Sequence, residues 1–169
     1  MLLLRIREGL PHGTARQLNA GMEKLRFSEQ IDAPVHRVWA AMLGPEGYRE
    51  WTGVFSPGSY FDGSWDEGSV IRFLGPGGVD AEGFGGLAAV VEGNRTHRFV
   101  SLRYTGEVVD GVENTESPIV GVRESYTFSE GDGTTTVDVE LDSVPGYTDV
   151  MVDAWPQGLA KLKQIAETP

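Results

Sequence analysis

The residue best suited to chemistry or ligand contact is Glu124, a carboxylate set among aromatic side chains. In the run Val122 to Phe128, a period of two places Glu124 on the same face as Tyr126, and that face is the inner one if its rings are buried. A buried carboxylate is costly unless a cation or hydrogen-bond donors accompany it. Arg72 and Arg103 are the candidate partners. Glu124 is therefore predicted either to anchor a ligand or to be structural, as a satisfied ion pair or as a carboxylate at the rim of the sheet.

The other candidates are large side chains that would surround a cavity. Small-molecule sites are usually apolar pockets with a few polar groups, although core packing explains each aromatic residue taken alone. Glu124, Arg72 or Tyr104 would set the orientation of a bound ligand. The predicted ligand-binding residues are Trp39, Trp51, Arg72, Phe73, Tyr104, Glu124, Tyr126, Met151 and Trp155.

Other kinds of site find little support. The sequence has no cysteine, which excludes disulfides, thiolate zinc sites and cysteine nucleophiles. His12, His36 and His97 are far apart, and no pair has the spacing of metal ligands on one helix. No Gly-x-Ser-x-Gly turn or lysine-bearing phosphate loop is present. We therefore predict no catalytic residue, no metal site and no cofactor.

The composition indicates one globular domain. The chain has 169 residues, of which 40% are hydrophobic and 23% charged. Its formal net charge of -11 repels phosphate backbones and anionic lipid headgroups, so nucleic acid and membranes are poor partners. No apolar run approaches the length of a spanning helix. We predict a cytoplasmic protein, monomeric or homodimeric, whose partner is a small hydrophobic ligand.

The chain divides near residue 22. Residues 1–21 carry a short apolar start followed at once by Arg5, which is too short for the apolar centre of a signal peptide. This segment is predicted to be a leader or a flexible arm. Residues 22–167 form the predicted folded domain.

Hydrophobic periodicity predicts the elements of this domain. Glu23 to Ile31 alternates like a half-buried strand, and Asp32-Ala33-Pro34 then starts a helix with an apolar stripe. After Gly44-Pro45 a second short helix follows. From Tyr147 the period is again helical, and Pro156 either kinks this last helix or opens its second half. Further strands are predicted at 59–61, 70–74, 84–91, 97–109, 121–128 and 134–141, with residues 110–118 as a loop.

Several short motifs occur in a familiar order. They are Ile31-Asp32-Ala33-Pro34, Val38-Trp39, Trp51, Gly83 to Val91, Glu124 to Phe128, and Trp155 to Lys163. In this order the chain resembles members of the START-like superfamily, also called SRPBCC. Within that superfamily it is similar to bacterial homologues of the activator of heat-shock-protein ATPase.

The resemblance implies an α+β helix-grip fold. A curved antiparallel sheet would wrap around the long C-terminal helix, with two short helices after the first strand. It also implies non-catalytic binding of a hydrophobic or amphipathic small molecule, a lipid included, in a cavity between sheet and helix. Two alternatives stay open: a cyclase or dehydratase acting on an aromatic or polyketide-like substrate, with Glu124 as acid or base, and a co-chaperone-like interaction module.

Overall fold

A computed structural model describes residues 22–77 and 83–168, so the predicted leader at 1–21 lies outside the described part. Three helices and eight strands follow one another along the chain. Their bounds are β1 Glu23–Ile31, α1 Val35–Leu43, α2 Pro45–Thr52, β2 Tyr60–Gly63, β3 Val70–Pro76, β4 Phe84–Arg95, β5 Phe99–Val109, β6 Val112–Asn114, β7 Arg123–Gly131, β8 Thr134–Ser143 and α3 Thr148–Glu167.

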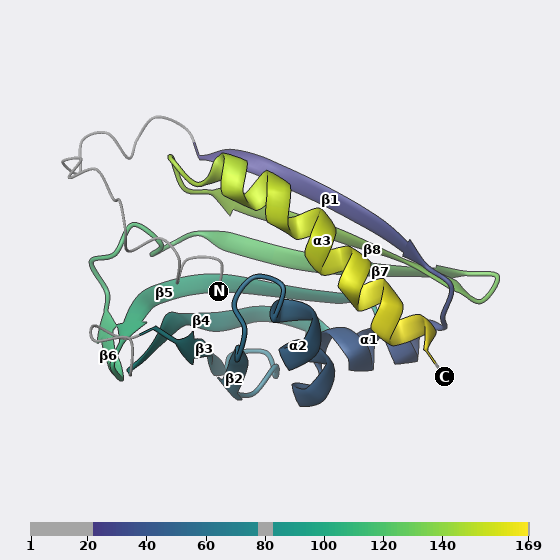
Figure 1. The fold of residues 1–169 in the computed structure, drawn as a ribbon, viewed down its shortest axis with the longest axis horizontal. Coiled ribbons are helices and arrows are strands. Elements are labelled where there is room, and N and C mark those ends of the chain that lie inside the picture. The colour runs from purple at the N-terminus through teal and green to yellow at the C-terminus, as the bar shows by residue number, and fades with distance from the viewer. Residues whose placement is uncertain (1–21, 78–82, 169) are drawn as a thin grey trace.

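The strands form one antiparallel sheet in the order β1-β8-β7-β5-β4-β3-β2, with β6 added beside β5. The first strand thus pairs with the last, which brings the two ends of the domain together. Figure 1 shows α3 lying across one face of the curved sheet, with α1 and α2 beside it. We call this covered face the inner face and the opposite one the outer face. The predicted helix-grip α+β fold is confirmed.

Two periodicities meet at the inner face. Along β8, Val137, Val139 and Leu141 are buried and alternate with more exposed residues, as a half-buried strand requires. Along α3, buried residues recur every three or four positions, among them Trp155 and Leu159. Each large apolar side chain buried in this way stabilises the fold by about 1.5–3 kcal/mol.

Helix α3 continues through Pro156 as one α-helix of 20 residues. Proline has no backbone N–H to donate within the helix, and its ring is solvent-exposed. The next residue makes a side-chain hydrogen bond within the helix, in which Gln157 Nε2 donates to the Asp153 carbonyl at 2.9 Å. No helix of the described residues is both long enough and apolar enough to cross a membrane.

The sheet has a short strand where a loop was predicted, and the pairing of β4 is irregular. Residues 110–118 contain the short strand β6, which a two-residue Asp110-Gly111 turn joins to β5. Both turn residues have positive φ, at 49° and 82°. The irregularities of β4 fall at Ala88/Ala89 and Val91/Gly93 and not at the glycine pair 85–86. Gly86 instead allows close strand approach, since a Cβ there would lie 1.8 Å from the Phe73 carbonyl oxygen.

Candidate ligand-binding site

A small cavity lies between the inner face of the sheet and the helices α2 and α3. Its open volume is about 50 Å³, which holds a few water molecules. Pockets for drug-sized ligands measure about 300–1,000 Å³, so a ligand of that size requires the walls to move. Seven of the predicted ligand-binding residues line the cavity: Trp51, Phe73, Tyr104, Glu124, Tyr126, Met151 and Trp155.

The other two predicted residues lie elsewhere. Trp39 on α1 is half-buried and packs its ring against Phe128 at 4.9 Å, away from the cavity lining. Arg72 lies on the outer face, since its strand neighbours Ile71 and Phe73 occupy the inner one. Placing Trp39 and Arg72 beside the cavity was therefore wrong. A period of two groups the residues of a strand correctly but does not say which group faces inward.

Glu124 lies on the inner face between two tyrosines. The hydroxyl of Tyr104 donates to Oε2 of Glu124 at 2.9 Å, and the hydroxyl of Tyr126 makes a short hydrogen bond to Oε1. The strands explain this arrangement. Tyr126 is two residues after Glu124 on β7, so both side chains lie on the same face. On the neighbouring strand β5, Leu102 pairs with Glu124, and Tyr104 follows two residues later on the same face as Leu102.

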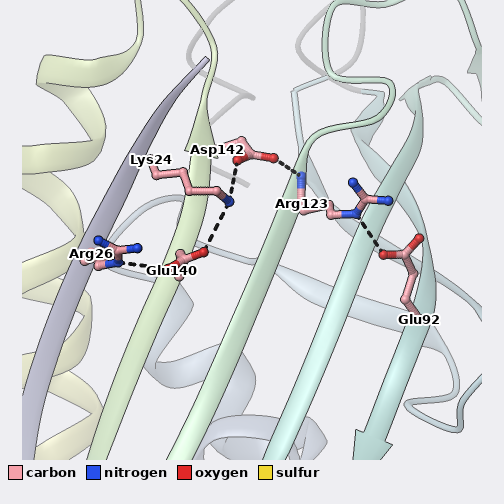
Figure 2. Close-up of polar contacts among 6 residues, drawn as sticks. All are labelled: Lys24, Arg26, Glu92, Arg123, Glu140 and Asp142. Carbon is pink, nitrogen blue, oxygen red and sulfur yellow. Dashed lines mark hydrogen bonds and ion pairs between the residues drawn. The ribbon is translucent and has the colours of Figure 1, made fainter. Parts of the chain in front are cut away.

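The predicted ion pair between Glu124 and an arginine is wrong. Arg103 and Arg123 lie on the outer face, where both contact Glu92, with N–O distances of 2.8 and 3.0 Å. Figure 2 shows the Arg123 contact within a chain of ion pairs and hydrogen bonds across the outer face. The guanidinium of Arg72 lies 4.0 Å from Glu113. Within residues 22–77 and 83–168 no salt bridge reaches Glu124.

The cavity shifts the proton affinities of its polar groups. Burial raises the pKa of Glu124, and the hydrogen bonds from Tyr126 and Tyr104 offset only part of that rise. Burial and the nearby Glu124 charge also hold the pKa values of Tyr104 and Tyr126 well above 10. Both hydroxyls therefore remain donors, and the carboxyl exchanges its proton at a higher pH than an exposed glutamate does.

Aromatic rings enclose the carboxyl. The ring of Tyr126 lies 6.3 Å from Trp155, and Trp155 lies 5.9 Å from Trp51. On the other side Phe73 lies 6.3 Å from Tyr104 and 5.8 Å from Tyr48. Few sites combine a carboxylate with so much aromatic surface, and such surfaces attract both flat apolar rings and cations.

Sequence reasoning missed several lining residues, among them the aromatic Tyr48 and Phe55. Tyr48 is three residues before Trp51 on α2, a spacing that signals a shared helix face. Phe55 follows that helix in a loop, where no periodicity applies. Its ring fits against Gly158 of α3, where an added Cβ would lie 2.5 Å from the ring. A glycine in the apolar stripe of a helix was the available signal.

The described residues offer no alternative centre for metal chemistry. Among them, no three His, Cys, Asp or Glu side chains are grouped so that they could hold a metal ion. His36 lies exposed on α1, whereas His12 lies outside the described residues. The aromatic cavity around Glu124 is therefore the candidate site on which the functional argument rests.

Solved structures with the same fold include proteins from several bacteria. The Aha1 dimer from Colwellia psychrerythraea aligns with a TM-score of 0.64 and 18% identity, over 86% of this chain and 97% of that one. Protein MLL2253 from Mesorhizobium loti gives 0.61 and 18%, over 85% and 96%. DynU16, a protein of the dynemicin biosynthetic locus, gives 0.61 and 16%, over 88% of this chain and 48% of that one. At such identities these likenesses show the fold.

The sequence comparison is more specific. A search of curated proteins finds no match to this chain. Residues 32–167 match the family described as Activator of Hsp90 ATPase homolog 1-like protein. The match runs from the start of α1 to the end of α3, and so includes every element that lines the cavity. The chain therefore belongs to the family of Activator of Hsp90 ATPase homolog 1-like proteins.

Proposed function

We propose that this domain binds a hydrophobic or amphipathic small molecule, such as a lipid, between its sheet and α3, without catalysis. The observation that carries the proposal is a cavity walled by aromatic side chains, with the part-buried carboxyl of Glu124 among them. Apolar walls supply affinity and a single polar group supplies orientation, which is how small-molecule sites are usually built. We place this activity in the cytoplasm, consistent with a sequence that has no cysteine.

Binding requires the cavity to enlarge, and Phe55 is the residue whose movement would do this. Its ring lies 5.6 Å from Trp155 and 5.8 Å from Trp51, so it fills space between α2 and α3. It belongs to the loop between α2 and β2, not to a helix or strand. A ligand that buries roughly 200 Å² of apolar surface in its place gains about 5 kcal/mol from the hydrophobic effect.

A ligand panel tests the proposal. Melting temperature is measured with fatty acids, sterols, flavonoids and aromatic polyketides, since a compound that binds only the folded state raises it. We expect at least one class to raise the melting temperature of the natural protein. The Phe55→Leu variant, with a wider cavity, should accept larger members of that class. The absence of any shift in both proteins would reject small-molecule binding.

A second candidate is a cyclase or dehydratase with an aromatic or polyketide-like substrate. The raised pKa of Glu124 favours it, because a carboxyl that stays protonated closer to neutral pH can act as a general acid. DynU16, with the same fold, comes from a biosynthetic locus. Turnover of a bound polyketide that Glu124→Gln abolishes, with binding retained, would support the enzyme over the carrier.

A third candidate is a co-chaperone-like interaction module, which the family description favours. The small volume of the cavity is also compatible with it. This reading predicts no ligand response in the panel and a stable complex with a chaperone ATPase. Such a complex, detected by analytical ultracentrifugation together with a flat ligand panel, would replace our first proposal. The same ultracentrifugation run distinguishes a monomer from a homodimer.

A further inference from the structure

Within the described residues, the carboxyl of Glu124 has hydrogen-bond donors and no cationic partner. Both of its described partners are tyrosine hydroxyls, from Tyr104 and Tyr126. The two arginines beside it in the sheet are Arg103 on β5 and Arg123 on β7. Both form salt bridges with Glu92 on the outer face. A buried carboxylate without a counter-charge is destabilising, and proteins usually pair it. The inner face therefore has an excess of negative charge in a place where water is largely excluded.

The surfaces around this carboxyl are suited to a positive charge. The faces of aromatic rings carry partial negative charge and attract cations to within about 6 Å of the ring centre. Tyr48, Trp51 and Trp155 line the same cavity as Glu124. No basic side chain from the described residues lines it. The carboxylate and the aromatic rings therefore both favour a positively charged ligand.

We propose that the ligand of this cavity carries a protonated or quaternary amine, which lies against Glu124 while the apolar part of the ligand contacts the surrounding rings. This inference rests on the proposed small-molecule function and narrows it to cationic amphiphiles. An anionic ligand such as a fatty acid is disfavoured, because its carboxylate would meet another in a low-dielectric space. A neutral alcohol gains a hydrogen bond but no charge pairing.

Binding of an amine is coupled to the proton of Glu124. Burial raises the pKa of this carboxyl in the empty protein, and a bound cation lowers it again. Affinity for the amine should therefore increase as pH rises through the pKa of Glu124, with a proton released on binding. The other titratable groups lining the cavity are Tyr48, Tyr104, Tyr126 and Asp142. The tyrosine pKa values are raised well above 10, so these residues stay neutral in this range.

Asp142 is the one other lining carboxylate, and its partners are those of the outer face. It accepts hydrogen bonds from Lys24 Nζ at 3.1 Å and from the backbone N–H of Arg123 at 3.0 Å, as Figure 2 shows. Its charge is thus balanced by Lys24. Of the two lining carboxylates, Glu124 is therefore the one that lacks a cation within the described part of the chain.

Matched ligands test the inference. Calorimetry compares benzylamine and octylamine with the alcohols and carboxylates of the same size, with the natural protein and with Glu124→Gln. We expect the amines to bind about tenfold or more tightly than the alcohols, as a charged hydrogen bond allows. In Glu124→Gln this preference for amines over alcohols should disappear, because the amide carries no charge. Glu140→Gln, the same change on the outer face of β8, should keep the preference.

Each outcome decides between the proposals. Alcohols or carboxylates that bind as tightly as the amines overturn the cationic ligand but leave small-molecule binding in place. An amine preference that survives in Glu124→Gln also overturns it, since the charge would then act elsewhere. If no member of the series binds either protein, the cationic ligand is rejected, and the ligand panel described above decides separately whether small-molecule binding stands. Circular dichroism of both variants verifies that the folded state is present.

Discussion

Glu124 differs in the chemistry of its partners from the ion-paired carboxylates of the outer face. The outer-face carboxylates Glu92 and Glu140 pair with arginine or lysine, and these cations lower their pKa values. Glu124 instead accepts hydrogen bonds from two neutral hydroxyls, and burial raises its pKa. Hydrogen bonds offset only part of the cost of burying a charge. The folded protein therefore holds the Glu124 proton more tightly than the unfolded chain does.

This difference predicts how stability changes with pH. A group whose pKa is raised on folding binds more protons in the folded state, so stability falls as pH rises from the ordinary glutamate value of 4.5 through the raised value. Glu124→Gln removes this titration. We expect the variant to gain stability relative to the natural protein as pH increases across that range. Urea unfolding at several pH values measures the difference, and a constant difference would contradict a raised pKa.

The two tyrosines allow a finer test at the same residue. The hydrogen bond from Tyr126 lowers the pKa of Glu124 more than the one from Tyr104 does. Tyr126→Phe should therefore raise the Glu124 pKa further, and Tyr104→Phe should raise it by a smaller amount. Carbon-detected NMR of the carboxyl measures both values. A fall in pKa in either variant would show that the hydroxyl acts as an acceptor and not as a donor.

The sequence predicted the position of Glu124 better than its partners. Alternation along one strand is a local property, so Val122 to Phe128 alone placed Glu124 and Tyr126 on one face, and the aromatic rings of that face favoured it as the inner one. The partners of Glu124 depend on which face of β3 and β5 the helices cover. Packing of α3 on the sheet determines that face, and the periodicity within one strand gives no information about it. Arg72 and Arg103 were therefore wrong candidates, since both lie on the outer face.

At the level of elements, the contact between Phe55 and Gly158 couples the α2–β2 loop to α3. Alanine at 158 would place a Cβ 2.5 Å from the Phe55 ring, although alanine favours helix over glycine by about 1 kcal/mol. We expect Gly158→Ala to be destabilising by about 1–3 kcal/mol, because overpacking outweighs helix propensity. Chemical denaturation measures the change.

A double variant provides the control for this contact. In a Phe55→Leu background the shorter side chain removes the atoms that meet the new Cβ. Gly158→Ala should then be neutral or stabilising, so that the two changes are strongly non-additive. Equal effects of Gly158→Ala in both backgrounds would mean that the clash is with some other group.

The elements themselves were mostly predictable, and the exceptions have local causes. Two Asp-Gly pairs form two-residue hairpin turns with positive φ: Asp110-Gly111 and Asp132-Gly133. The second lies between the strands predicted at 121–128 and 134–141, whose alternation indicates a hairpin. The first was missed because β6 has only three exposed residues and no apolar pattern. A turn signal without alternating neighbours is easily taken for a loop.

On the scale of the whole molecule, the sheet separates two electrostatic environments. Its outer face carries a run of ion pairs from Arg26 through Glu140 and Lys24 to Asp142, with a further pair between Arg123 and Glu92 (Figure 2). These charges are in contact with solvent and are screened by salt. The inner face carries one carboxyl among rings. The net charge of -11 does not predict this division, because the division depends on how the charged residues are arranged and not on how many there are.

Acid should change the contributions of Glu92 and Glu124 to stability in opposite directions, and the two contributions should be independent. Arg123 and Arg103 lower the pKa of Glu92, so its stabilising effect is present above the ordinary glutamate value and is lost as pH falls through the lowered one. Glu92→Gln should weaken the loss of stability in acid and reduce the sensitivity of unfolding to salt. It should leave the Glu124 pKa and the binding of the amine probes unchanged, because the sheet lies between the two carboxyls. NMR titration of the Glu92→Gln variant measures the Glu124 pKa, and urea unfolding at low and high salt measures the change in stability. A Glu124 pKa that differs from that of the natural protein would show that the outer ion pairs influence the cavity.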